Sequence, residues 1–115
     1  MVDEHERRAL NEALFRDVNE RIAESAEHFE ADQTEFVCEC ADSSCTERVP
    51  ATLAEYESVR QKSTTFLLAP GHGEPDIEQV VSDRGRFQVV EKLGEVMRRT
   101  VIRLDPRTRP RPSES

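Results

Sequence analysis

The residues best equipped for chemistry in this sequence are three cysteines, Cys38, Cys40 and Cys45, and the chain has no others. A single residue separates Cys38 from Cys40, which is too close for an unstrained disulfide between them. Both thiolates can bind one metal ion if the backbone turns around it. Structural zinc sites use four ligands, usually cysteine sulfur and histidine nitrogen atoms. The cluster therefore predicts a zinc site with one ligand still to be found.

Histidine supplies the candidates for that fourth ligand. His72 lies between two glycines, and glycine lets the backbone approach a metal closely. His28 lies ten residues before Cys38 on an expected helix and is the alternative, whereas His5 is too far along that helix. We predict a zinc site of three cysteines and one histidine, with the ligands Cys38, Cys40, Cys45 and His72, and His28 stays open as a replacement for His72.

Other uses of the thiols are open at this point. They could serve as a thiol-based redox or metal sensor, or hold an iron–sulfur cluster, because a Cys-x-Cys pair with a later Cys and His resembles the CDGSH iron–sulfur proteins. The chain lacks their Cys-Asp-Gly segment, and its third cysteine comes too early. Zinc is therefore preferred to iron.

Catalysis is the less favoured use of the cluster. Glu39 and Asp42 would raise the pKa of a nearby thiol, which disfavours a cysteine nucleophile. A catalytic zinc would keep one position open for water, with Glu39, Asp42 or Glu74 as its base. The sequence also has no phosphate-binding glycine loop and no serine-nucleophile elbow. We therefore expect that the protein is not an enzyme and that its zinc is structural.

Length and charge limit the remaining possibilities. The 115 residues fit one domain, and a domain of this size often gains from a bound metal. The formal net charge is −8, which disfavours direct binding to nucleic acid or to an anionic membrane. The sequence has no apolar run of membrane-spanning length and no signal-peptide pattern, so we expect a cytoplasmic protein whose thiols stay reduced.

The elements that must position the cysteines begin with one long helix, expected over residues 3–30. Leu10, Leu14, Val18 and Ile22 recur every four residues and predict an apolar stripe. Such a helix would be about 40 Å long, which is more than the width of a small domain. The stripe is expected to pack along its own domain, or to bind another protein or a second copy of the chain.

A small antiparallel sheet and one short helix are expected to follow. Residues 34–38, 46–51, 65–69 and 86–92 are typical of strands, and 77–82 fit either a strand or a short helix. Thr52 and Glu55 form a capping box for a helix that ends near residue 62. The predicted fold class is α+β, with one zinc-stabilised domain over residues 1–93. Residues 94–115 are rich in Arg and Pro and are expected to form a flexible tail.

Four segments together resemble a group of small, uncharacterised actinobacterial proteins: Phe36–Cys40, Thr52–Tyr56, Ala69–His72 and Val89–Lys92. The resemblance spans most of residues 11–92. It implies no activity, and it favours the cytoplasm and a single unit from Cys38 to Lys92. The function predicted is that of a zinc-binding regulatory or protein-interaction module.

Overall fold

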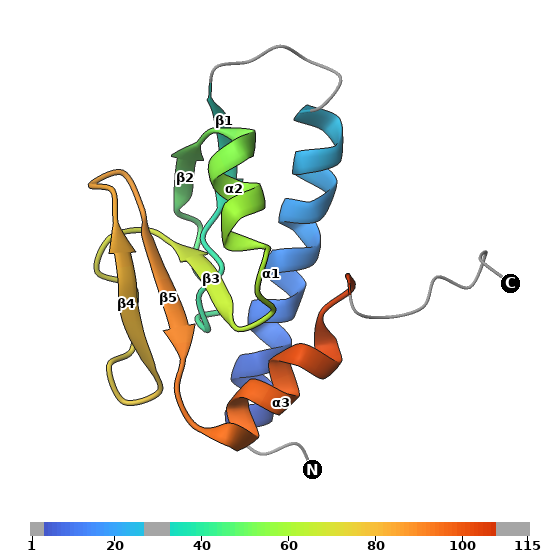
Figure 1. Ribbon diagram of the computed structural model, residues 1–115, viewed down its shortest axis with the longest axis vertical. Helices are drawn as coiled ribbons and strands as arrows, with labels where there is room; N and C mark the ends of the chain where they lie inside the picture. Colours follow the sequence, from blue (N-terminus) through green and yellow to red (C-terminus); the bar gives the residue numbers. More distant parts are fainter. Residues whose placement is uncertain (1–3, 27–32, 108–115) are drawn as a thin grey trace, which may run out of the picture.

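The computed structural model describes residues 4–26 and 33–107. Helix α1 (Glu4–Ala26) is followed by a hairpin of β1 (Thr34–Val37) and β2 (Arg48–Ala51). Next come α2 (Leu53–Val59), β3 (Thr65–Leu68), the hairpin of β4 (Glu78–Asp83) and β5 (Gln88–Lys92), and α3 (Glu95–Leu104). The α+β prediction is confirmed, but the strands form two antiparallel sheets, β1-β2 and β3-β5-β4, where one was expected (Figure 1).

Helix α2 begins as its capping box predicts. The Glu55 backbone N–H donates to the Thr52 hydroxyl oxygen at 3.0 Å, and the Thr52 N–H donates to the Glu55 carboxylate at 2.8 Å. Tyr56 is fully buried on the inner face of this helix and stacks on Phe36 of β1, with ring centroids 4.5 Å apart. The aromatic pair therefore ties α2 to the β1-β2 hairpin that leads into the cysteines.

Helix α1 packs on the domain through a different face from the one predicted. Leu10, Leu14 and Val18 keep 43%, 62% and 40% of their surface exposed, so most of the expected stripe lies at the surface. Ile22 is half-buried and does pack against the core. The buried face of α1, on the opposite side of the helix, carries five residues: Ala9, Glu12, Arg16, Asn19 and Ala23.

Polar side chains on α1 make the contacts that were assigned to the apolar stripe. Arg16 is buried over the Phe66 ring, with its guanidinium carbon 3.7 Å from the centroid, and donates to the Ser63 carbonyl at 2.8 Å. Glu12 pairs with Lys92 of β5, which is also buried and pairs with Glu78. Burial raises the pKa of the Glu12 carboxyl to about 7, against the opposing effect of the Lys92 ammonium. The helix is thus held by hydrogen bonds and ion pairs more than by hydrocarbon contacts.

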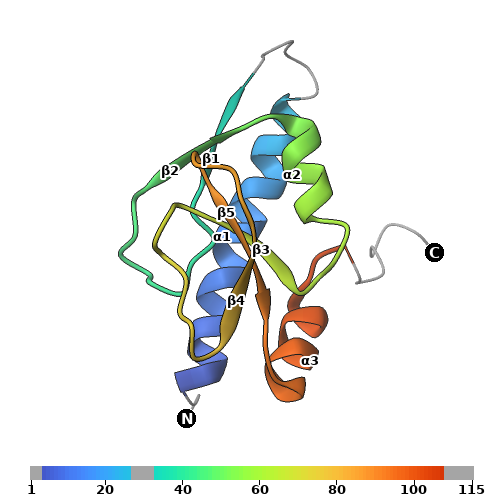
Figure 2. The ribbon, with the colours of Figure 1, turned by 60° about the vertical axis from the view of Figure 1, so that its left-hand side comes forward.

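The predicted domain boundary at residue 93 is wrong. Residues 95–104 form α3, which packs across the N-terminal half of α1 (Figures 1 and 2). Gly94 opens the helix with a φ of +87°, a backbone conformation that favours glycine. Met97 and Val101 are buried one turn apart and join the core. The many arginines concealed this apolar spacing, and residues 108–115 of the predicted tail lie outside the described residues.

Asp105 completes the attachment of α3. Its buried carboxylate accepts two hydrogen bonds from the Arg60 guanidinium, at 2.5 and 3.1 Å. Burial alone would raise the pKa of Asp105, but the hydrogen bonds from Arg60 and Ser63 outweigh it and hold that pKa at about 2. A residue assigned to a flexible tail thus forms part of the interior.

Over the described ranges, 4–26 and 33–107, no helix is both long enough and apolar enough to cross a membrane.

Candidate metal centre

The site forms where the chain leaving β1 meets the chain leaving β3. The Glu39 N–H donates to the Leu67 carbonyl at 2.8 Å, which joins the end of β1 to the edge of β3. Beyond this contact, the Ala69 N–H donates to Cys38 Sγ at 3.2 Å. The loop after β1 carries the three cysteines and the loop after β3 carries His72, so this contact brings the four residues together.

The four predicted ligands lie close enough to share one ion. One sulfur or nitrogen atom from each of Cys38, Cys40, Cys45 and His72 lies within 4.8 Å of the other three. His72 Nδ1 is 3.7 Å from Cys38 Sγ and 3.6 Å from Cys45 Sγ. A tetrahedral zinc with ordinary bond lengths separates nitrogen and sulfur ligands by about 3.6 Å and two sulfurs by about 3.8 Å. The group can therefore hold a metal ion with little rearrangement.

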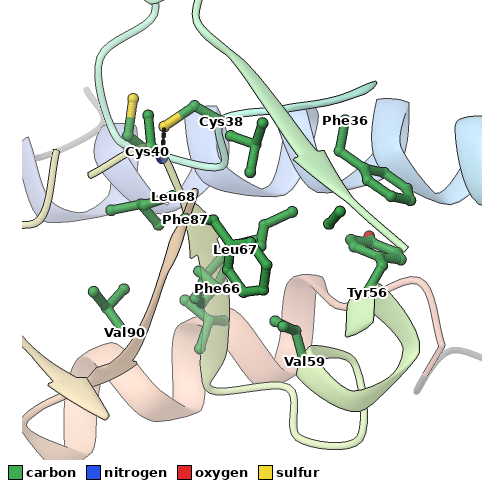
Figure 3. Close-up of a cluster of buried hydrophobic side chains, with 14 of the residues drawn as sticks. Phe36, Cys38, Cys40, Tyr56, Val59, Phe66, Leu67, Leu68, Phe87 and Val90 are labelled. Carbon is green, nitrogen blue, oxygen red and sulfur yellow. Dashed lines mark hydrogen bonds between the residues drawn. The ribbon is translucent and has the colours of Figure 1, made fainter. Parts of the chain in front are cut away.

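Burial divides the ligands into an inner and an outer pair. Cys38 and Cys40 are buried and lie at the edge of the core, near Leu68 and Phe87 (Figure 3). Cys45 and His72 are half-buried. A bound ion would therefore be anchored from inside the domain and approached by solvent from the side of Cys45 and His72.

Two turns give the loops their shape. Asp42 accepts hydrogen bonds from the Ser44 N–H at 2.9 Å and the Ser44 hydroxyl at 2.6 Å, and the Cys45 N–H donates to the Asp42 carbonyl. In the second loop Gly71 has a φ of +82°, and the His72 N–H donates to the Ala69 carbonyl at 3.1 Å. A side chain at position 71 would strain this turn, so Gly71 helps to aim His72 at the thiols.

Hydrogen bonding between the thiols also favours a thiolate among the three cysteines. A hydrogen bond from the Cys38 thiol lowers the pKa of Cys40 to about 5. The same hydrogen bond, together with burial, raises the pKa of Cys38. Burial also raises the pKa of Cys45. The hydrogen bond between Cys38 and Cys40 thus favours one thiolate in this pair, and a bound cation would stabilise thiolates at all three sulfurs.

The carboxylates considered as catalytic bases are engaged elsewhere. The Glu39 side chain is fully buried and bonded to interior groups, away from the sulfurs. Asp42 holds Ser44, and these hydrogen bonds lower its pKa. Glu74 pairs with Arg8 of α1. Within the described residues, the group that could hold a metal contains no carboxylate.

The sequence predicted the three cysteines and His72 as ligands, but it did not predict the structural role of Glu39. Its carboxylate meets Asn19 and Arg16 of α1 and Tyr56 of α2. The only signal in the sequence was the recurrence of polar residues on one face of α1, which is typical of a solvent-exposed surface. The alternative fourth ligand, His28, lies outside the described residues.

No protein-family model matches the chain, and neither the curated proteins nor the solved structures include a significant match to it. The resemblance to small actinobacterial proteins therefore stays a prediction.

Proposed function

We propose that this protein binds one zinc ion through Cys38, Cys40, Cys45 and His72, and that the zinc is structural. The observation that carries the proposal is the convergence of these four ligand atoms within 4.8 Å of one another. Three thiolates and one imidazole form a donor set that zinc favours, and four protein ligands leave no position for a reacting water. The engagement of Glu39, Asp42 and Glu74 in other contacts also favours a structural role over a catalytic one.

The compactness of the ligand group favours one ion over an iron–sulfur cluster. In a cluster, ligands on different iron atoms are separated by the iron and sulfide atoms between them. Here the N···S distances of 3.6 and 3.7 Å fit ligands of a single ion. The three free thiols also fit the cytoplasm, where cysteines stay reduced.

Purified protein is expected to contain one zinc per chain by elemental analysis, with no iron. His72→Ala is expected to weaken zinc binding by at least about tenfold in competition with a chromogenic chelator, because three cysteines alone lack one of the four ligands that structural zinc requires. His28→Ala is the matched control and should bind zinc as the parent does. Iron with visible absorption, or a larger effect of His28→Ala than of His72→Ala, would contradict the assignment.

We further propose that the protein acts as a regulatory or protein-interaction module in which α1 contacts a partner. The support is the row of exposed apolar side chains on α1, Leu10, Leu14 and Val18, on the face opposite the buried one. Three such residues at helical spacing suit a groove or a second helix. The partner is another protein or a second copy of the chain.

Leu14→Glu is expected to leave the free energy of unfolding within about 0.5 kcal/mol of the parent, because Leu14 is 62% exposed and both residues are good helix formers. The same change should abolish any self-association that the parent shows in sedimentation equilibrium, or its binding to a partner protein. Glu24→Gln, at an exposed position of α1 outside the row, is the control. A Leu14→Glu variant that unfolds would place Leu14 in the core and contradict the proposal.

A second candidate is a redox sensor, favoured by the half-buried positions of Cys45 and His72. Peroxide that reaches the outer ligands could oxidise two thiolates to a disulfide, with reduction of peroxide to water and release of zinc. Fast zinc release by mild peroxide that a thiol reductant reverses would favour the sensor. Zinc retention under the same conditions favours the structural site.

A further inference from the structure

Glu39 links the metal ligands to the interior. It lies between Cys38 and Cys40, and its side chain reaches into the contact between α1, α2 and β3. One carboxylate oxygen accepts from Asn19 Nδ2 at 2.9 Å and from the Tyr56 hydroxyl at 3.1 Å. The other accepts from the Leu67 N–H at 3.1 Å. Any movement of the two flanking ligands must therefore move this carboxylate.

Helix α1 also holds the backbone of the cysteine segment directly. Asn19 Oδ1 accepts from the Val37 N–H at 2.7 Å, and Asn19 Nδ2 donates to the Val37 carbonyl at 2.8 Å. About two turns further toward the N-terminus of the helix, Asn11 Nδ2 donates to the Ala41 carbonyl at 3.1 Å. These contacts lie immediately before and after the Cys38–Cys40 segment. Helix α1 is thus hydrogen-bonded to the backbone just before Cys38 and just after Cys40.

The other buried contacts of the helix are also polar. Between the buried Ala9 and Ala23, the fully buried side chains of α1 are Glu12, Arg16 and Asn19. Arg16 lies 3.8 Å from the Glu39 carboxylate, and its Nε has no hydrogen-bond partner within the described residues. A buried polar group without its partner costs about 1–3 kcal/mol. If Glu39 is displaced, Asn19 Nδ2 loses one of its acceptors and the buried Arg16 guanidinium loses a neighbouring carboxylate, and both losses weaken the docking of α1.

We propose that Glu39 is a positioning residue that couples the metal site to the docking of α1. The coupling rests on the proposed zinc binding. Zinc fixes the backbone on both sides of Glu39. This holds the Glu39 carboxylate within reach of Asn19, Arg16 and Tyr56. By linkage, a docked helix raises the affinity of the site for zinc by the same factor by which zinc favours docking. Zinc binding then stabilises the docking of α1, and α1 is the helix that carries the exposed Leu10, Leu14 and Val18.

The test uses Glu39→Gln in the full chain, with Glu35→Gln as its matched control. Glu35 is exposed on β1, so the control makes the same chemical change outside the interior. In Glu39→Gln one carboxylate oxygen becomes an NH2 group, which then faces either the donors Asn19 Nδ2 and the Tyr56 hydroxyl or the Leu67 N–H. Zinc affinity, measured with a chromogenic chelator, is expected to fall about tenfold or more in Glu39→Gln and to stay at the parent value in Glu35→Gln.

Hydrogen exchange separates positioning from a general loss of stability. In zinc-saturated Glu39→Gln, amides of α1 are expected to exchange about tenfold faster, while amides of β3 and β5 keep their protection. Val59→Ala, which opens a cavity in α2, serves as a destabilised reference and should speed exchange in the sheet as well as in α1. A parent that binds no zinc would overturn the proposed function. A parent that binds zinc, with unchanged affinity or unchanged α1 exchange in Glu39→Gln, would overturn the coupling alone.

Discussion

A Cys40→Ser variant is expected to unfold as a whole at a temperature roughly 10–20 °C below the parent, a shift that corresponds to about 3 kcal/mol for a domain of this size. Cys40 is buried, and its sulfur lies within 4.8 Å of the other three ligand atoms. Structural zinc sites in small peptides bind with about 10–16 kcal/mol, which is comparable to the whole stability of a domain. Losing one ligand should therefore remove a large part of the folding free energy.

The measurement is thermal unfolding of the parent and the variant, each with saturating zinc and with a chelator. Ser43→Ala lies in the same loop on an exposed residue and should match the parent. The chelator should lower the midpoint of the parent close to that of Cys40→Ser with chelator. Equal midpoints for all four samples would mean that the cysteines contribute nothing as metal ligands.

A chain that ends at residue 93 is expected not to fold cooperatively, whereas a chain that ends at residue 107 should fold like the parent. The shorter chain loses the buried side chains Met97 and Val101, each worth about 1.5–3 kcal/mol. It also loses Asp105 and leaves Arg60 buried without that partner, which costs about 3–5 kcal/mol more. The sum approaches the total stability of a small domain.

The two chains are compared by urea unfolding followed by circular dichroism. Asp105→Asn in the full chain isolates the ion pair and should lower the unfolding free energy by about 3 kcal/mol. Arg98→Ala, on an exposed residue of α3, serves as the control. A cooperative transition at the parent midpoint for residues 1–93 would show that α3 is dispensable, as the sequence alone suggested.

The sequence predicted those features of the fold that depend on residues close together in the chain. The capping box at Thr52 and Glu55 formed as expected, because both partners lie within one turn. The cysteine cluster and the Gly-flanked His72 were identified because metal ligation restricts residue type and spacing more tightly than packing does. The sequence of residues 77–82 fits either a helix or a strand, and the pairing of β4 with β5 decides for the strand.

Tertiary contacts decided the parts that were missed. A leucine row on a long helix is typical of a buried face. The groups that face α1 are backbone carbonyls, the Glu39 carboxylate and the Phe66 ring, so Arg16 and Asn19 turn inward instead. In α3, Met97 and Val101 are spaced for a helix, yet the surrounding arginines suggested a tail. The α1 result does not follow from periodicity alone, because it depends on what the facing surface offers. The helical spacing of α3 is present in the sequence, but the Arg-rich and Pro-rich composition favoured a tail.

The buried polar and charged side chains that attach α1 to the domain also affect how the free energy of unfolding depends on temperature. Exposing apolar surface on unfolding raises the heat capacity by about 0.45 cal/K/mol per Å², whereas exposing polar surface lowers it by about 0.26. Glu12, Arg16, Asn19, Glu39 and Lys92 occupy buried space that hydrocarbon would otherwise fill. Their release into water offsets part of the apolar contribution, so the change in heat capacity per residue is expected to fall below that of an apolar core of equal size. The stability curve is then flatter, and the domain loses less of its stability for each degree away from its optimum.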